Sequence, residues 1–378
     1  MTLSRFLKSS ALISLTVAFC IPQVCAAQNS SGNQSWTSSD QRGTLGGVVN
    51  PSRTNETHTE ADGRVVDGTS VETLGPDGRY IPYSDTEKES RRINDTTVRT
   101  VERTYGRDSD GHRSLVRETQ EESRSLPGGE QKVTRTVSSP DADGRLQILQ
   151  RQLEDSKQVS PGVRVTNTTL LSPDINGGFS AAVQTEQRET KGSDGTVESR
   201  KSTLLPDGIG GWRLSEVRES TTKPDGQGST KDERVLRPDS NGKFAVVERT
   251  IDKQAQTSTG ERRDTTETYS ANVPGVAGDG SLQLVQRQTT VQRTTSLGAQ
   301  STVRQIEQPR PGESSHDLHV TQEAIDIVRA GGSGTADQSH AILTSDPDGH
   351  LGQVWIDTSK TDNPSAVKVD TSTSKKPR

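Results

Sequence analysis

Apolar positions recur at a fixed place in a repeated pattern along most of the chain. The residue two positions after a recurrent glycine, here called the lead glycine, is apolar in eight of ten units: Val48, Tyr80, Leu146, Phe179, Trp212, Phe244, Leu282 and Leu351, with Arg113 and Ser314 as exceptions. In six units the position two further on is apolar: Leu115, Ile148, Ala181, Leu214, Val246 and Leu284. Side chains alternate along a strand, so both positions are expected on one face of a strand.

The lead glycines mark one turn of the repeat, and a second set of glycines marks another. The lead glycines are Gly46, Gly78, Gly111, Gly144, Gly177, Gly210, Gly242, Gly280, Gly312 and Gly349. The second set is Gly63, Gly129, Gly162, Gly195, Gly228, Gly260 and Gly298, and six of these follow a lead glycine by 18 residues. Asn94-Asp95 replaces the second glycine in one unit, which is compatible with a tight turn because Asn and Asp tolerate left-handed backbone.

The residues before the lead glycine indicate hairpin turns. The run Pro173-Asp174-Ile175-Asn176-Gly177 is typical. Proline restricts φ, aspartate accepts hydrogen bonds from nearby backbone, and glycine supplies positive φ. Glu, Arg and Gln in the arms would also suit a helix. Turns every 15 to 18 residues, frequent Thr and Val, and the absence of a 3.6-residue period favour strands of roughly 10–12 residues instead.

Each unit is therefore predicted to be a β-hairpin, and successive hairpins to form an antiparallel meander. Val137, Leu170-Leu171, Leu204-Leu205 and Val235-Leu236 precede the lead turns and should lie opposite the apolar residues that follow them. The rest of each arm, such as Gln184 to Glu189, is polar on both faces. An apolar band this narrow requires neighbouring units to stack. The expected fold class is all-β: tandem repeats of about 33 residues in a twisted sheet or superhelical ribbon, with disordered termini.

Composition and the N-terminal sequence divide the chain further. Only 26% of residues are apolar and 3% aromatic, which disfavours a large compact core. Residues 1–27 resemble a secretory signal peptide, with Arg5 and Lys8 before an apolar run and small residues near Ala26. Residues 28–42 are expected to be a flexible linker, 43–311 the hairpin array, 312–358 divergent C-terminal repeats or a cap, and 359–378 a mostly disordered tail.

Removal of the expected signal peptide would change the cysteine content and the net charge of the chain. Cys20 and Cys25 both lie within residues 1–27, so disulfides are not expected to stabilise the mature protein. The formal charge is −5, and loss of Arg5 and Lys8 makes it −7. Charges of both signs are interspersed, which disfavours nucleic acid as a partner because such proteins carry a basic patch. No segment of the mature chain is apolar enough for a transmembrane helix.

No catalytic, cofactor or metal site is predicted. Asp108/Asp110, Asp141/Asp143 and Asp346/Asp348 resemble the start of a calcium loop, but Thr119 and Gln152 occupy the twelfth position in the first two, where a bidentate Glu is expected. His316 and His319 should point to opposite faces of a strand, and His340 and His350 lie nearby in sequence. There is no Gly-x-Ser-x-Gly nucleophile motif.

These observations predict an exported, non-enzymatic β-repeat protein with a structural or binding role at the cell envelope or outside the cell. A periplasmic, secreted or cell-surface location fits the leader. A glycan, a wall polymer or another protein would be the partner, and no cofactor is expected. Two alternatives stay open: a self-assembling fibre or matrix subunit, for which the C-terminal repeats 312–358 could be a docking surface, and an envelope hydrolase with an unrecognised site.

Overall fold

The protein is an all-β chain whose strands form one antiparallel meander. The computed structural model describes residues 33–41, 48–61, 64–75, 77–108, 110–272, 281–295, 298–310, 317–330, 336–346 and 349–361. The expected signal peptide and residues 362–378 of the expected tail lie outside these ranges. Each strand from β2 to β19 pairs with the strand before it and the strand after it, while β1 pairs with β2 and β20 with β19, which confirms the predicted fold class.

The described residues contain twenty strands and one short 3-10 turn. The elements are β1 (Asn33–Gln41), β2 (Val48–Ala61), β3 (Arg64–Leu74), β4 (Tyr80–Arg92), β5 (Thr97–Arg107), β6 (Arg113–Ser125), η1 (Pro127–Gly129), β7 (Gln131–Pro140), β8 (Leu146–Ser160), β9 (Val163–Pro173), β10 (Phe179–Lys191), β11 (Val197–Pro206), β12 (Trp212–Asp225), β13 (Gly228–Pro238), β14 (Phe244–Gln256), β15 (Arg262–Ser270), β16 (Gln283–Thr294), β17 (Gln300–Pro309), β18 (Leu318–Ala330), β19 (Ala336–Ser345) and β20 (Leu351–Thr361). β1 lies within the expected linker, and β18 to β20 fall almost wholly within the expected divergent repeats. No helix among the described residues is long and apolar enough to span a membrane.

The lead turns follow the predicted chemistry. In the turn between β9 and β10, the backbone N–H of Asp174 donates to the Gly178 carbonyl (3.0 Å), and that of Gly177 donates to the Asp174 carbonyl (3.1 Å). Gly177 has φ of 78°. This is a type I turn followed by a left-handed residue, the usual three-residue hairpin loop. Positive φ recurs at the described lead glycines Gly78, Gly111, Gly144, Gly177, Gly210, Gly242 and Gly349.

One second-turn glycine differs from the prediction. Gly228, 18 residues after Gly210, is not the left-handed residue of its turn; Gly226 is, with φ of 57°. Gly228 instead begins β13, where an added Cβ would lie 1.9 Å from the carbonyl oxygen of Gln254. Glycine is therefore required there for close approach of the neighbouring strand. Gly46, Gly63, Gly280 and Gly312 lie outside the described residues.

The register places the two predicted apolar sets opposite each other. Leu204 pairs with Leu214, and Leu171 pairs with Ala181. At the base of several turns a proline pairs with a large apolar residue: Phe179 with Pro173, Trp212 with Pro206, Phe244 with Pro238 and Leu146 with Pro140. Paired residues lie side by side on one face. We call the face that carries these pairs the Phe179 face, and the opposite one the Glu154 face.

A β-bulge, an extra residue in one strand of a pair, recurs in every even-numbered strand from β4 to β20. Between β9 and β10, for example, Ala181 pairs with Leu171 and Val183 with Leu170, so Ala182 has no partner. The unpaired residues are Tyr83, Val116, Leu149, Ala182, Ser215, Val247, Val285, Thr321 and Val354. Bulges increase local twist and bend the strand.

The bulges also correct the sequence alignment of one repeat. All the unpaired residues except Thr321 lie five positions after a lead glycine, whereas Thr321 lies nine after Gly312. Counting back five from Thr321 makes His316 the equivalent of a lead glycine. Leu318 then takes the apolar position two residues later, and Gly334 follows His316 by 18 residues. The apparent exception at Ser314 was therefore an alignment error.

The sheet has little hydrophobic core. Among the described residues, the buried apolar side chains are Val133, Val217, Val235, Ala299, Ala324 and Ile342, and only Ile342 is fully buried. The buried polar residues are at least as numerous: Thr54, Thr97, Glu118, Ser156, Thr185, Ser301 and His340. The backbone ladders and cross-strand side-chain pairs therefore carry much of the stabilisation.

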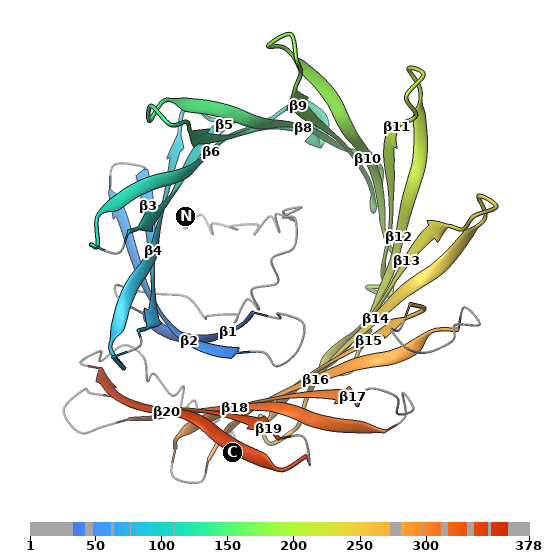
Figure 1. Ribbon diagram of the computed structural model, residues 1–378. Coiled ribbons are helices and arrows are strands. Elements are labelled where there is room, and N and C mark those ends of the chain that lie inside the picture. The colour runs from blue at the N-terminus through green and yellow to red at the C-terminus, as the bar shows by residue number, and fades with distance from the viewer. Residues whose placement is uncertain are drawn as a thin grey trace, which may run out of the picture.

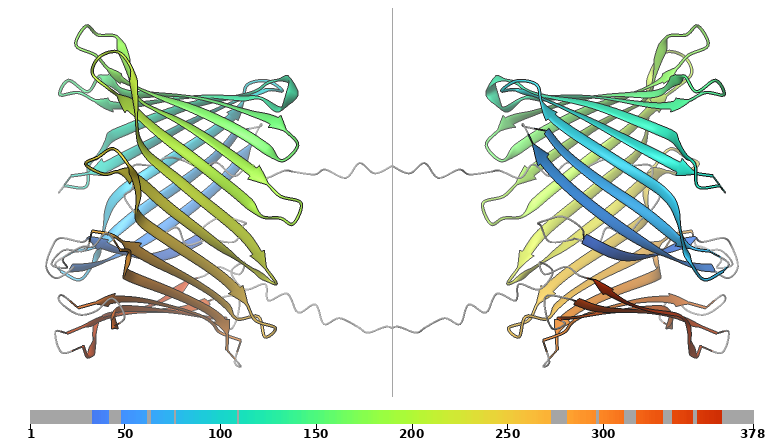
Figure 2. Two further views of the ribbon diagram at one scale, coloured as in Figure 1. Left: turned by 90° about the vertical axis from the view of Figure 1, so that its right-hand side faces the viewer. Right: turned by 90° about the vertical axis from the view of Figure 1, so that its left-hand side faces the viewer.

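The sheet curls round along its length, with β20 and the β1–β2 hairpin at the two ends of the curl (Figure 1). The hairpin turns lie at two opposite rims (Figure 2), as a meander requires. In the described residues no ladder joins β20 to β1 or β2, so the sheet is open. Side chains from four neighbouring strands, β12 to β15, converge on one cavity, chiefly from the Glu154 face. This convergence identifies the Glu154 face as the concave one there.

Candidate functional site

The aspartates of the lead turns act mainly as local caps. Oδ1 of Asp108 accepts hydrogen bonds from the backbone N–H of Asp110 (3.0 Å) and His112 (2.8 Å). The same double acceptance occurs at Asp141, Asp174, Asp207 and Asp239. The backbone N–H groups of Ile209 and Gly211 hold the pKa of Asp207 below its ordinary value.

The calcium-like turns lack a complete ligand set among the described residues. Asp108, Asp110 and His112 bring one ligand atom each within 4.8 Å of the others, and all three are exposed. The twelfth-position residues Thr119 and Gln152 lie within strands β6 and β8 and pair with neighbouring strands rather than with the turns. Asp348 lies outside the described residues. These acids are explained by turn formation.

The histidines are not brought together in the described part of the chain. His340 in β19 is buried, and its Nδ1 is hydrogen-bonded to Oδ1 of Asp326 in β18. His319 lies in β18 nearer the lead-turn rim, pairing in register with Gln308. His350 is exposed in the turn before β20, with Nδ1 3.4 Å from Oδ2 of Asp346. His316 lies outside the described residues.

A network of alternating charges crosses the Glu154 face. Glu216 of β12 accepts hydrogen bonds from Nε of Arg218 (2.7 Å) and from Nη2 of Arg237 in β13 (2.8 Å). Glu233 of β13 lies 3.5 Å from Arg218 and accepts a hydrogen bond from Nζ of Lys231 at 2.7 Å. Burial opposes ionisation of Glu216, but the two arginine hydrogen bonds outweigh it and keep its pKa low. This network holds charged groups in fixed positions without a large net charge.

Two other ionisable side chains on the Glu154 face, in β8 and β11, are partly shielded from water. Glu154 in β8 and Lys201 in β11 are about half-buried. Burial raises the pKa of Glu154, with nearby Arg135 opposing the change, and burial lowers the pKa of Lys201, reinforced by Arg218. Lys201 influences the pKa of Glu154 although two strands, β9 and β10, lie between them, which is expected where side chains converge on a concave surface.

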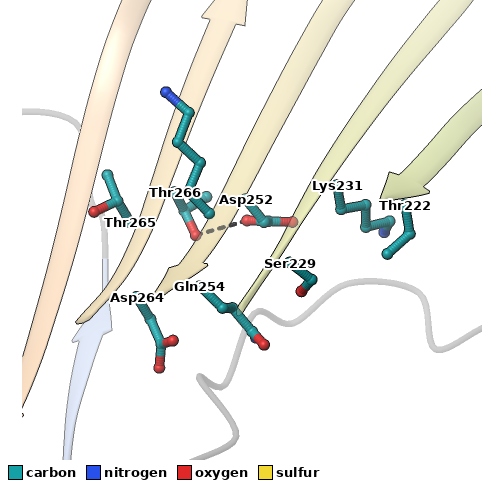
Figure 3. Close-up of a pocket in the computed structure, with 9 residues that line it drawn as sticks. Thr222, Ser229, Lys231, Asp252, Gln254, Asp264, Thr265 and Thr266 are labelled. Atoms are coloured by element: carbon teal, nitrogen blue, oxygen red, sulfur yellow. Dashed lines mark hydrogen bonds between the residues drawn. The ribbon is translucent and has the colours of Figure 1, made fainter. Parts of the chain in front are cut away.

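The network leads to a polar cavity of about 270 Å³ near the second-turn rim. Asp252 of β14 accepts a hydrogen bond from Oγ1 of Thr266 in β15 (2.7 Å), and Lys231 approaches from β13 (Figure 3). The remaining lining includes Thr222, Ser229, Gln254 and Asp264. The volume is just below the usual range of about 300–1,000 Å³ for small-molecule sites. Carboxylates, an amine, an amide and hydroxyls here supply both donors and acceptors.

Sequence comparison assigns the chain to no known family. No protein-family model matches it, and the search of characterised proteins finds no significant match. The candidate site therefore rests on geometry alone. Sequence reasoning missed it because Lys231, Asp252 and Asp264 resemble the many other polar residues of the arms. Only the bulges and the curvature determine which of them converge.

Proposed function

We propose that the protein is an exported, non-enzymatic binding scaffold that holds a hydroxyl-rich polymer, a glycan, along the concave Glu154 face. Its place of action would be the cell envelope or the space outside the cell. The observation that carries the proposal is the row of fixed hydrogen-bonding groups on this face, from Glu216 in β12 to the cavity around Asp252.

The chemistry of this surface suits a sugar polymer better than a strongly charged ligand. Sugar hydroxyls both donate and accept hydrogen bonds, and they complement a surface where carboxylates alternate with arginine and lysine. The cavity is large enough for a single ring-sized unit, and the concave face on both sides of it would contact neighbouring units. Ordering these side chains in advance reduces the entropy lost on binding.

A binding role is favoured over hydrolysis by the state of the acidic groups. Glu216 is held by two arginines, and Asp207 and its equivalents are engaged by their own turns. General acid–base catalysis requires a group that can exchange a proton with the substrate. Glu216 and the turn aspartates instead serve as fixed hydrogen-bond acceptors.

Affinity electrophoresis would test the proposal. The full chain would be run in native gels containing a neutral β-glucan, an acidic polysaccharide or soluble peptidoglycan fragments. We expect at least one glycan to slow migration, and Asp252→Ala to weaken the effect. Loss of a hydrogen bond to a charged group costs about 1.5–3 kcal/mol, which corresponds to a loss of affinity of roughly ten- to a hundredfold. Glu198→Ala is the matched control, because it removes the same charge from an exposed position on the Phe179 face.

Two results would contradict the proposal. The first is unchanged migration in every glycan. The second is equal weakening by Asp252→Ala and Glu198→Ala, which would show a dependence on net charge rather than on the Glu154 face. Retention on a protein partner, without glycan binding, would favour the protein-binding alternative.

A further inference from the structure

The last strand of the sheet has an exposed edge. β20 pairs with β19, and the described residues include no strand on its other side. Val354 and Ile356 are 55% and 57% exposed, and Leu351 is also exposed. An exposed edge with apolar side chains is a template for pairing with another strand. β1, at the opposite end of the sheet, pairs with β2, and no other described strand lies beside it.

The internal repeats show what kind of strand would fit this edge. In seven ladders, the part of an even-numbered strand after its bulge pairs with the following odd-numbered strand without a further register shift. In two ladders the residue after the bulge stands opposite the residue five before the next lead glycine: Ser84 opposite Gly106, and Gln322 opposite Thr344. The ladders β6–β7, β10–β11 and β12–β13 begin one pair later in the same register. The ladders β14–β15 and β16–β17, which precede the two irregular lead turns, have a different offset. These ladders cover eight or nine residue pairs in β5, β7, β11 and β13, and β1 has nine residues.

The same rule defines a register between β20 and a β1 strand. The residue after the bulge of β20 is Trp355, and the residue five before Gly46 is Gln41. Opposing these two positions pairs seven of the nine residues of β1, Ser35 to Gln41, with Trp355 to Thr361 at the end of β20, and places Ser38 opposite Thr358. Because the sheet has an even number of strands, β1 and β20 run in opposite directions, so this pairing is antiparallel.

The two faces of the sheet provide an independent check on this register. Following the ladders strand by strand, position 38 of β1 and Thr358 of β20 belong to the Phe179 face. A register wrong by one residue would join opposite faces. We propose that β20 of one copy pairs with β1 of a second copy, so that copies add head to tail. Such an interface is heterologous and leaves a free edge at each end for further growth.

Cysteine cross-linking tests both the partner and the register. The background is the full chain with Cys20→Ser and Cys25→Ser, which removes every native thiol. One variant carries Ser38→Cys and a second carries Thr358→Cys. Mixed under mild oxidation, they should form a covalent dimer, because cross-strand pairs lie within disulfide reach. Val116→Cys replaces Thr358→Cys in the control, since Val116 is 51% exposed but lies on internal strand β6.

A variant that carries both Ser38→Cys and Thr358→Cys should give a series of covalent multimers. For the unmodified chain, light scattering should show that the average molecular mass rises about twofold or more as the protein concentration increases. Intramolecular disulfides alone would overturn the proposal, because β1 of the same chain would then occupy the edge. A mixed dimer no more abundant than in the Val116→Cys control would also overturn it, as would a constant monomer mass. Far-UV circular dichroism would confirm that each variant retains its strands. Glycan binding in the same preparations is read separately, so failure of assembly leaves the proposed function intact.

Discussion

The bulge in β10 predicts opposite responses to deletion and insertion at one position. Deleting Ala182 joins Ala181 directly to Val183, and their partners Leu171 and Leu170 are already adjacent. The ladder becomes regular, and every later residue keeps its partner and face. The lost methyl group is worth at most about 0.8 kcal/mol. We therefore expect deletion to change the free energy of unfolding by no more than about 1 kcal/mol.

Inserting an alanine after Ala182 should cost more. The added residue has no partner in β9, so it must be ordered at about 1–2 kcal/mol and leaves a ladder hydrogen bond unmade at about 0.5–1.5 kcal/mol. The expected destabilisation is about 1.5–3.5 kcal/mol. Urea unfolding followed by far-UV circular dichroism measures it, with an alanine inserted after Gly192 in the next turn as control. Equal destabilisation by deletion and insertion would refute the assigned register.

Three further substitutions test the core, the Glu154 face and the turns. Ile342→Ala, at a fully buried site, should lower the free energy of unfolding by about 2–5 kcal/mol, whereas the fully exposed Ile175→Ala should leave it unchanged in the same urea titration. Because burial raises the pKa of Glu154 in the folded state, ionised Glu154 destabilises the fold once the pH rises through that pKa. Glu154→Gln should therefore raise the melting temperature at neutral pH and leave it unchanged in acid. A lower melting temperature at neutral pH would contradict this. Gly177→Ala should destabilise by about 1–2 kcal/mol from backbone strain alone, since no atom lies within 4 Å of the added Cβ, and a neutral effect on the urea midpoint would exclude the left-handed turn.

The turns and the apolar band could be predicted because their causes are local. Pro173, Asp174 and Gly177 each have a conformational role that their chemistry specifies. The pairing of Leu204 with Leu214 follows from turn position and strand alternation. In the turn after β12 two glycines compete, and spacing favoured Gly228 although Gly226 has the positive φ.

The bulges and the concave face could not be predicted because they depend on long-range pairing. Residues as different as Tyr83, Ala182 and Ser215 occupy the bulge position, so no residue type marks it. Each bulge reverses the alternation of faces in its strand, and without that information Asp252 cannot be assigned to either face. The cavity therefore became visible only in the folded sheet.

Amide hydrogen exchange in β9, β10 and β11 tests most directly whether the ladder, rather than a core, holds the sheet together. Arg188 lies in the polar half of β10 and is paired on both sides, with Val165 and Arg200. We predict that amides around Arg188 are protected as strongly as those beside the apolar pair Ala181 and Leu171. Exchange around Arg188 at the rate of an unfolded chain, with protection confined to the apolar end, would contradict the continuous sheet on which the proposed binding face depends.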